Sequence, residues 1–394
     1  MFLAIYDPTA PGEDFFSWRT VQQVASNLEP AIGPALVALA ACALLTLIVI
    51  WISSRVGFIA YPRDRDIHSK PIPYGGGLAM FAAFAITCLA FLRHDPNVPG
   101  LLLLCGATAA IFVIDDQWGI PALVKLGVQA AIAVAAVKLF GFEIHFLLVW
   151  LATLTASLPF LQIHNLGLLI LPITVLWILG MQNAANLLDG VDGLAAGVIG
   201  VTAVVLLVAS AGRQQDVVVL SAALVGVCAG FLLFNFHPAR IFMGDSGAYF
   251  LGLAVALLSV AGVAKVAVAA AIAVPLLAMG LPIVDTGIAI IRRRRNGKAA
   301  FGPDTEHIHH RLLGLGLTQR QTCLLFYCAS GILGAIGLTV FGHRRILAVV
   351  IVLMIVVLST AMGERLRASS RRVPFPFGQA MRQLLVGRAV KGVR

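Results

Sequence analysis

Long apolar runs restrict the fold of this chain more than any other feature of its 394 residues. A run of about twenty apolar residues can cross the hydrocarbon core of a bilayer as a helix. A helix also satisfies its own backbone hydrogen bonds inside lipid. The sequence therefore predicts an all-α, polytopic membrane protein with about eleven transmembrane helices. These cover residues 33–54, 75–93, 99–114, 121–140, 167–183, 193–211, 217–235, 246–263, 266–291, 321–341 and 345–362.

The distribution of basic residues predicts how the chain is oriented. Its net charge is +10, but Lys and Arg concentrate in a few loops and in the C-terminal tail. With the N-terminus outside, 21 of the 28 Lys and Arg lie on the inner side and 7 on the outer side. This is the positive-inside pattern, so we expect a membrane protein and no nucleic-acid partner. The predicted parts are an extracytoplasmic segment (1–32), a transmembrane domain (33–362) and a basic cytoplasmic tail (363–394).

One further apolar segment, Ile144 to Ile163, is also long enough to cross. A crossing there would put Asn183 on the opposite side of the membrane from the loop at Arg63. The segment contains Thr, Ser and Pro residues, which favour a hairpin or a re-entrant stretch over a spanning helix. We expect it to stay on the outer side.

The most polar interruption between apolar runs is NAANLLDGVDGLAAG, residues 183–197. Polar side chains between membrane-length segments are costly in lipid, so this stretch is a candidate site. Asn186 and Asp189 are three residues apart and would share one side of a helical turn, with Asn183 and Asp192 less closely aligned. Such a group offers oxygen ligands to a hard cation.

Two other inner loops precede this stretch. The first, Tyr61 to Gly77, has basic residues followed by a glycine run, which would either hold a phosphate with its N–H groups or allow tight helix packing. The second has the adjacent carboxylates Asp115 and Asp116, with Lys125 just beyond them. Adjacent carboxylates repel each other unless a cation is near, although a solvated pair is a simpler explanation for these two alone.

Two more inner loops follow it. The loop NFHPARIFMGDSG places Asp245 at the start of an apolar run, where its carboxylate could complete an oxygen site. The longest loop, Arg292 to Arg320, contains His307, His309, His310 and Arg311. Three histidines can bind zinc, but the nearby arginine and the absence of cysteine favour a grip on an anion or nucleotide.

All five loops lie on the predicted cytoplasmic face, which indicates one composite active site there. Carboxylates, a divalent metal ion and cationic side chains together suit phosphoryl transfer, because the charge on phosphate oxygens must be neutralised. The alternative is a secondary transporter for an anionic solute. Transporters usually bind near the bilayer midplane and contain structural repeats. We find no repeat here, and the carboxylates lie at span ends.

The motifs at residues 183–197, 115–116, IFMGDSGAYFLG and FGPDTEHIHHRLL together resemble the polyprenyl-phosphate N-acetylhexosamine-1-phosphate transferases, of the glycosyltransferase 4 type. The resemblance covers the second to the tenth predicted span. The HIHHRL form is similar to the N-acetylglucosamine-type enzymes. The implied partners are a UDP-N-acetylhexosamine, undecaprenyl phosphate and the lipid bilayer of a bacterial cytoplasmic membrane, and a homodimer is left open. The implied reaction releases UMP and leaves a lipid-linked diphosphate sugar.

The resemblance also implies residue roles. Mg²⁺, or Mn²⁺ in its place, would be bound by Asn186 and Asp245. Catalytic roles fall on five carboxylates: Asp115, Asp116, Asp189, Asp192 and Asp245. Asp115 or Asp116 is the expected base beside the lipid phosphate. Substrate-binding roles fall on Arg65, His68, Lys125, Asn183, Asp192, His307, His309, His310 and Arg311. Lys125 would lie at the lipid phosphate, and Asp189, Asp192 and the histidine loop on the donor side.

The first loop departs from the family pattern at two positions. Where the family usually has an Asp and an Arg, this chain has Ala60 and Tyr74. Arg65, His68, Pro71 and Pro73 do match. The departures bear on the donor contacts of this loop and leave the metal motifs unaffected.

Overall fold

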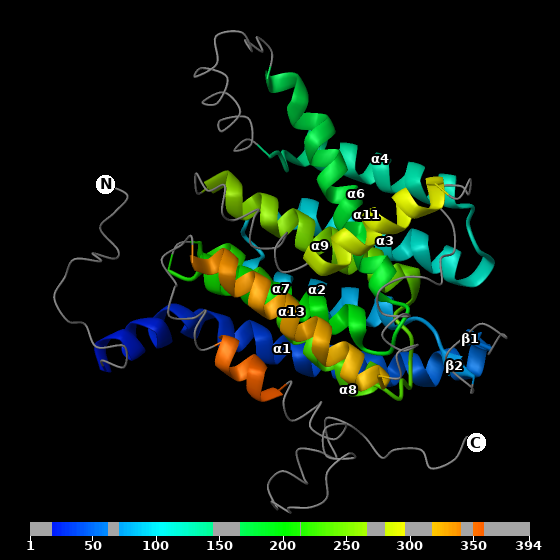
Figure 1. Ribbon diagram of the computed structural model, residues 1–394, viewed down its shortest axis with the longest axis horizontal. Helices are drawn as coiled ribbons and strands as arrows, with labels where there is room; N and C mark the ends of the chain where they lie inside the picture. The colour runs from blue at the N-terminus through cyan, green and yellow to red at the C-terminus, as the bar shows by residue number, and fades with distance from the viewer. Residues whose placement is uncertain are drawn as a thin grey trace, which may run out of the picture.

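The computed structural model describes residues 18–61, 71–144, 166–212, 214–265, 280–295, 317–339 and 350–357, almost all of them helical (Figure 1). The helices are α1 (Trp18–Val56), α2 (Gly76–Leu92), α3 (Val98–Trp118), α4 (Ala122–Phe140), α6 (Ile170–Leu188), α7 (Leu194–Ser210), α8 (Gln215–Asn235), α9 (Gly244–Lys265), α11 (Gly280–Arg295) and α13 (Gln319–Thr339). A 3-10 turn, η1 (Leu166–Leu169), precedes α6, and residues 350–357 form a further helical stretch. The strands β1 (Ile59–Ala60) and β2 (Ile72–Pro73) pair antiparallel, with Ala60 opposite Ile72.

Seven of the described helices are long and apolar enough to cross a membrane. The apolar helices α2 and α7 have 17 residues each. This gives a length of about 25 Å, near the lower limit for a span. The prediction of a helical, polytopic membrane protein is confirmed. Among the described residues, the short β1–β2 hairpin is the exception to all-α structure. The ninth predicted span, 266–291, is described only from residue 280.

Helix α1 begins at Trp18, well before the predicted span at residue 33. Its 39 residues give a length of about 58 Å, roughly twice the hydrocarbon thickness of a bilayer. The helix packs closely along α8, where Gly226 and Gly230 face it. A Cβ at Gly230 would lie 2.6 Å from the carbonyl oxygen of Leu39, and one at Gly226 would collide with that of Ala35. Small residues spaced by four allow this backbone contact.

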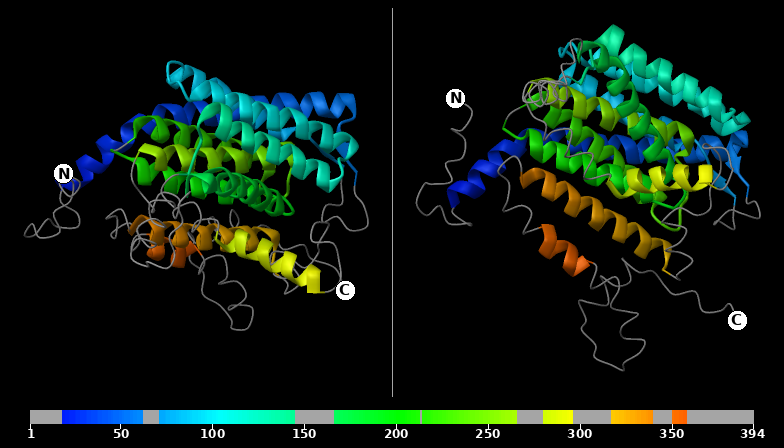
Figure 2. Two further views of the ribbon diagram at one scale, coloured as in Figure 1. Left: turned by 90° about the horizontal axis from the view of Figure 1, so that it is seen from above. Right: turned by 45° about the horizontal axis from the view of Figure 1, so that its top comes forward.

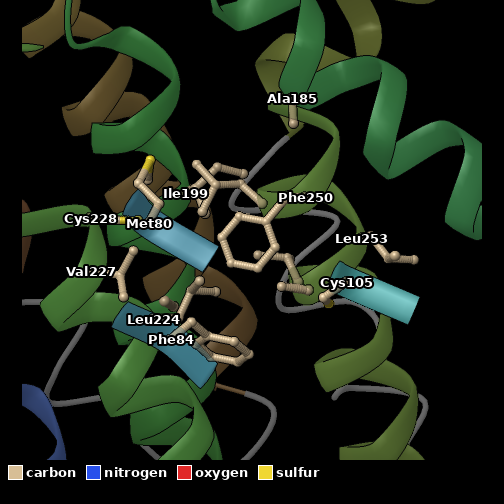
Figure 3. Close-up of a cluster of buried hydrophobic side chains, with 14 of the residues drawn as sticks. Met80, Phe84, Cys105, Ala185, Ile199, Leu224, Val227, Cys228, Phe250 and Leu253 are labelled. Carbon is tan, nitrogen blue, oxygen red and sulfur yellow. The ribbon is translucent and has the colours of Figure 1, made fainter. Parts of the chain in front are cut away.

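Helix α9 forms the centre of the bundle. Every residue from Ala248 to Val260 is buried. The Phe250 ring lies 5.7 Å from that of Phe81 and 5.8 Å from that of Phe84, both on α2. Figure 3 shows Phe250 among buried side chains of the surrounding helices. Helix α13 lies along one side of the bundle against α7 (Figure 2). Because α9 is enclosed, the bundle fixes the position of its first residues.

The glycine run before α2 serves helix packing. The N–H of Gly76 donates to the carbonyl oxygen of Phe242 (3.0 Å), and that of Gly77 to Met243 (3.1 Å). A Cβ at Gly76 would lie 2.5 Å from the Phe231 ring, and one at Gly77 would collide with the backbone of Gly247. Of the two interpretations of this run, tight packing is therefore correct. Phosphate binding by the N–H groups of Gly76 and Gly77 is wrong, because both are already bonded.

Helices α4 and α6 run in opposite directions. Lys125 near the start of α4 and Asn186 near the end of α6 both contact Asp245. Beyond the other end of α4, the N–H of Ile144 donates to the Thr174 hydroxyl on α6 (3.1 Å). The chain therefore leaves α4 and re-enters the bundle at the same end. The intervening segment, including most of the predicted hairpin or re-entrant stretch at 144–163, lies outside the described residues.

Candidate active site

Four helix ends bring polar side chains together at one end of the bundle. The Lys125 Nζ lies 2.5 Å from Asp115 Oδ2 and 2.7 Å from Asp245 Oδ2. The Asn186 Nδ2 donates to Asp245 Oδ1 at 2.9 Å. These residues come from the end of α3, the start of α4, the end of α6 and the start of α9. The sequence-predicted Asp115, Lys125, Asn186 and Asp245 thus form a single cluster.

Asp116 points away from its neighbour and caps α9. Its Oδ1 accepts the N–H of Asp245 (2.7 Å), and its Oδ2 accepts that of Ser246 (3.3 Å). Gly244 precedes the helix with φ +70, and a Cβ there would collide with the Asp116 carboxylate. A carboxylate at a helix N-terminus satisfies N–H groups that have no partner within the helix. Asp116 therefore positions Asp245, and its role as a base stays a prediction.

Asp189 ends α6, with its N–H bonded to the Asn186 carbonyl oxygen. Burial, and then the negative charges of Asp245, Asp116 and Asp192, raise its pKa well above the usual range. Carboxylates that crowd in this way disfavour one another's ionisation unless a cation is present. Among the described residues, Lys125 is the only ammonium group bonded to this cluster. The cluster is therefore suited to a further cation.

Asn183 bonds inside the bundle, away from Asp245. Its Nδ2 donates to Gln129 Oε1 and to the carbonyl oxygen of Leu179, both at 2.8 Å. Gln129 is buried and was not among the predicted site residues. The signal was present, because Gln129 follows Lys125 by four residues in an otherwise apolar run and so shares its helix face. Substrate binding by Asn183 stays a prediction.

Asp192 lies outside the Lys125 cluster. Its Oδ2 lies 2.8 Å from His237 Nδ1 and accepts the N–H of Ala239 (3.1 Å). Its carbonyl oxygen accepts the Cys323 thiol of α13 (3.2 Å). The expected alignment with Asn186 fails because α6 ends at Leu188. His237 and Cys323 carried no recognisable signal as partners of a residue so distant in sequence.

Gly193 turns the chain from this loop into α7, with φ +82. Its N–H donates to Asn235 Oδ1 (3.0 Å), and its carbonyl oxygen accepts the Tyr327 hydroxyl (2.6 Å). L-residues with side chains rarely adopt this conformation, so the turn needs glycine here. Gly193 therefore forms the turn between the polar residues that follow α6 and the start of α7.

The two departures from the family pattern have structural roles. Ala60 pairs with Ile72 in the hairpin. The Tyr74 ring lies 5.6 Å from Phe58 and 5.9 Å from Phe242, and its carbonyl oxygen accepts the Ser53 hydroxyl at 2.8 Å. Tyr74 therefore ties the hairpin to α1 and to the loop before α9.

Six predicted site residues lie outside the described part of the chain: Arg65, His68, His307, His309, His310 and Arg311. Zinc at the histidine loop therefore stays untested. Within the described ranges, no three His, Cys, Asp or Glu side chains converge closely enough to hold a metal by themselves.

Residues 98–263 match the family model of glycosyl transferase family 4. This segment contains all the residues of the Lys125 cluster. A Bacillus subtilis (strain 168) protein, named probable undecaprenyl-phosphate N-acetylglucosaminyl 1-phosphate transferase, is 34% identical over 335 residues. The alignment covers 84% of this chain and 90% of that protein. The chain therefore belongs to glycosyl transferase family 4, and the resemblance found in the sequence is confirmed.

Two further relatives have related names. A Mycobacterium tuberculosis decaprenyl-phosphate N-acetylglucosaminephosphotransferase is 34% identical over 337 residues, which are 76% of this chain and 80% of that protein. A Yersinia pestis undecaprenyl-phosphate alpha-N-acetylglucosaminyl 1-phosphate transferase is 28% identical over 303 residues, which are 74% of this chain and 79% of that protein. None of these relatives supports the transporter alternative.

The raised pKa of Asp189 predicts a pH-dependent stability difference for Asp189→Asn. A carboxyl whose pKa is raised by folding stabilises the protein below its unfolded value, about 3.9, and this contribution is lost as pH rises through the folded value. We expect the variant's Tm to match the wild type near pH 4 and to exceed it increasingly at higher pH. Thermal unfolding in detergent with EDTA measures this. A Tm difference that stays constant with pH would contradict the assignment.

Proposed function

We propose that this protein transfers N-acetylglucosamine-1-phosphate from UDP-N-acetylglucosamine to undecaprenyl phosphate. The products are UMP and a lipid-linked diphosphate sugar, which begins the synthesis of a bacterial cell-surface glycan. The observation that carries the proposal is the Lys125–Asp115–Asp245–Asn186 cluster, held at one end of an apolar bundle in a family 4 chain. The names of the relatives support this choice of sugar and lipid.

The reaction exchanges one phosphate linkage for another. An oxygen of the lipid phosphate forms a bond to the sugar-bound phosphorus, and the bond from that phosphorus to UMP breaks. Negative charge on the phosphate oxygens must be neutralised along the way. The Lys125 ammonium supplies part of this charge and is held by Asp115. The lipid phosphate is largely ionised near neutral pH, so Asp115 or Asp116 would assist as a base only for its protonated fraction.

A Mg²⁺ ion, or Mn²⁺ in its place, belongs to this proposal. The donor set fits a hard cation, because the Asp245 carboxylate lies beside an excess of carboxylates. The Asn186 amide donates its N–H to Asp245, and it would turn its Oδ1 toward a bound ion. Protein Mg²⁺ sites often use one or two carboxylates and complete the shell with water and substrate phosphates. This explains how the site can work without three converging protein ligands. When bound, the ion would neutralise phosphate charge.

The membrane orientation is also proposed. The 21 to 7 distribution of Lys and Arg supports an outside N-terminus, with the Lys125 cluster and the tail facing the cytoplasm. The bacterial cytoplasmic membrane is the proposed location. We propose that Arg65, His68, His307, His309, His310 and Arg311 bind the donor from the same face.

The proposal predicts metal-dependent UMP release. Purified protein in detergent, given undecaprenyl phosphate, UDP-N-acetylglucosamine and Mg²⁺, is expected to release UMP. EDTA should stop the release and added Mg²⁺ restore it. A donor panel with the galacto, fuco and quinovo relatives then ranks the sugars. A folded preparation that releases no UMP with any of these donors would contradict the proposal.

A further inference from the structure

His237 is held on two sides in the loop between α8 and α9. Its Nδ1 lies 2.8 Å from Asp192 Oδ2, and its carbonyl oxygen accepts from Arg320 Nε at 2.8 Å. The Arg320 guanidinium also lies 5.8 Å from the centre of the Phe236 ring. These contacts fix both the backbone and the ring plane of His237. The imidazole is nevertheless accessible, with 37% of the side chain exposed.

The partners of Asp192 define which imidazole nitrogen carries the proton. The same oxygen, Oδ2, accepts the N–H of Ala239 at 3.1 Å, so it acts as a hydrogen-bond acceptor. An ionised carboxylate can only accept, and the Nδ1 of His237 must then donate. In the neutral imidazole this leaves Nε2 as an acceptor. The described residues supply no partner for Nε2.

His237 also lies at the end of the bundle that holds the Lys125 cluster. Asp192 belongs to the turn that begins at Asp189, and Asp189 interacts with the charges of Asp245 and Asp116. Asp245 follows His237 by eight residues, across the loop that leads into α9. The free Nε2 is therefore an acceptor at the same end as the Lys125 cluster.

We propose that His237 is a donor-binding residue, whose Nε2 accepts a hydrogen bond from a hydroxyl or N–H group of the nucleotide sugar. This inference rests on the proposed function. Of the two substrates, the nucleotide sugar carries hydroxyl and N–H groups, whereas the ionised lipid phosphate has none to donate. His237 therefore contributes to recognition of the donor and not of the lipid. Asp192 acts through His237 as a positioning residue.

Two substitutions separate the two imidazole nitrogens. In His237→Asn the amide N–H can replace Nδ1 at Asp192, but nothing replaces Nε2. We expect the donor KM to rise about tenfold, as for one lost hydrogen bond. The KM for undecaprenyl phosphate and the Tm should stay at wild-type values. In His237→Gln the longer amide oxygen can replace Nε2, so part of the donor affinity should return.

His94→Asn is the matched control. His94 is exposed, bonds to Arg93 and follows the end of α2 that is remote from the cluster. Its substitution should change none of these quantities. A His237→Asn enzyme whose donor KM stays within about twofold of the wild type would overturn the inference and leave the proposed function intact. Equal rises in both KM values, or a lowered Tm without a selective donor effect, would also overturn it.

The Tm shift caused by UDP-N-acetylglucosamine gives a readout that needs no turnover. The wild type should gain stability from the donor, and His237→Asn should lose most of that gain. A wild type that binds the donor but releases no UMP would contradict only the proposed function. If the wild type shows neither UMP release nor a donor-dependent Tm shift, both proposals fail.

Discussion

Asp245→Asn is expected to abolish most turnover while the protein stays folded. The carboxylate of Asp245 accepts hydrogen bonds from Lys125 and Asn186 and is the proposed metal ligand at the start of the most enclosed helix. An amide has nearly the same shape but lacks the charge that binds a divalent cation. Loss of metal stabilisation worth several kcal/mol corresponds to a fall of about 10³-fold in kcat. UMP release under saturating substrates measures it.

The fold should survive this change because Lys125 keeps its contact with Asp115, and Asp116 still caps α9 through backbone N–H groups. Asp95→Asn is the matched control, since Asp95 is a partly exposed carboxylate in the α2–α3 turn that bonds only the nearby N–H of Asn97 among the described residues. It should keep wild-type turnover. An Asp245→Asn protein with near-normal turnover would exclude the proposed metal role.

Gly77→Ala is expected to lower the stability of the bundle through a single added methyl group. The new Cβ would collide with the backbone N and Cα of Gly247, which cannot move as a flexible side chain can. Overpacking of this kind costs about 1–3 kcal/mol. Because Gly247 lies two residues after Asp245, the strain should also displace the cluster and lower turnover. Thermal unfolding in detergent and UMP release measure the two effects.

Gly180→Ala gives the matched control in another helix. Gly180 lies within α6, and a Cβ there would meet nothing within 4 Å. Alanine costs less backbone entropy on folding, so this variant should gain about 0.5–1 kcal/mol. If both variants lost stability equally, close contact at Gly77 would not be the cause.

The helices were largely predictable because a membrane span is recognised in the sequence by the length of its apolar run. The start of α1 was not, since residues 18–32 contain polar side chains and Pro30, and a second proline, Pro34, follows inside the helix. A helix can continue beyond the apolar run that marks a membrane span, and apolarity alone does not locate its end. The prediction therefore began the helix at residue 33.

The site was predictable where residues lie at the ends of packed helices. Asp115, Lys125, Asn186 and Asp245 could be grouped because their spans begin or end on one predicted face. Asp192 could not be placed, because the helical spacing used to align it stops at Leu188. The contact between Asp192 and His237 joins residues 45 positions apart in the sequence. No local sequence pattern predicts such a contact.

The adjacent carboxylates of Asp115 and Asp116 have different structural roles. Asp115 holds the Lys125 ammonium, whereas Asp116 accepts backbone N–H groups of α9. A capping role can be filled by Asn, Ser or Thr as well as Asp, but an ion pair requires the charge. In family members that have lost catalysis but kept the helical bundle, we therefore expect a capping residue to remain at the position of Asp116. The position of Asp115 should be substituted first.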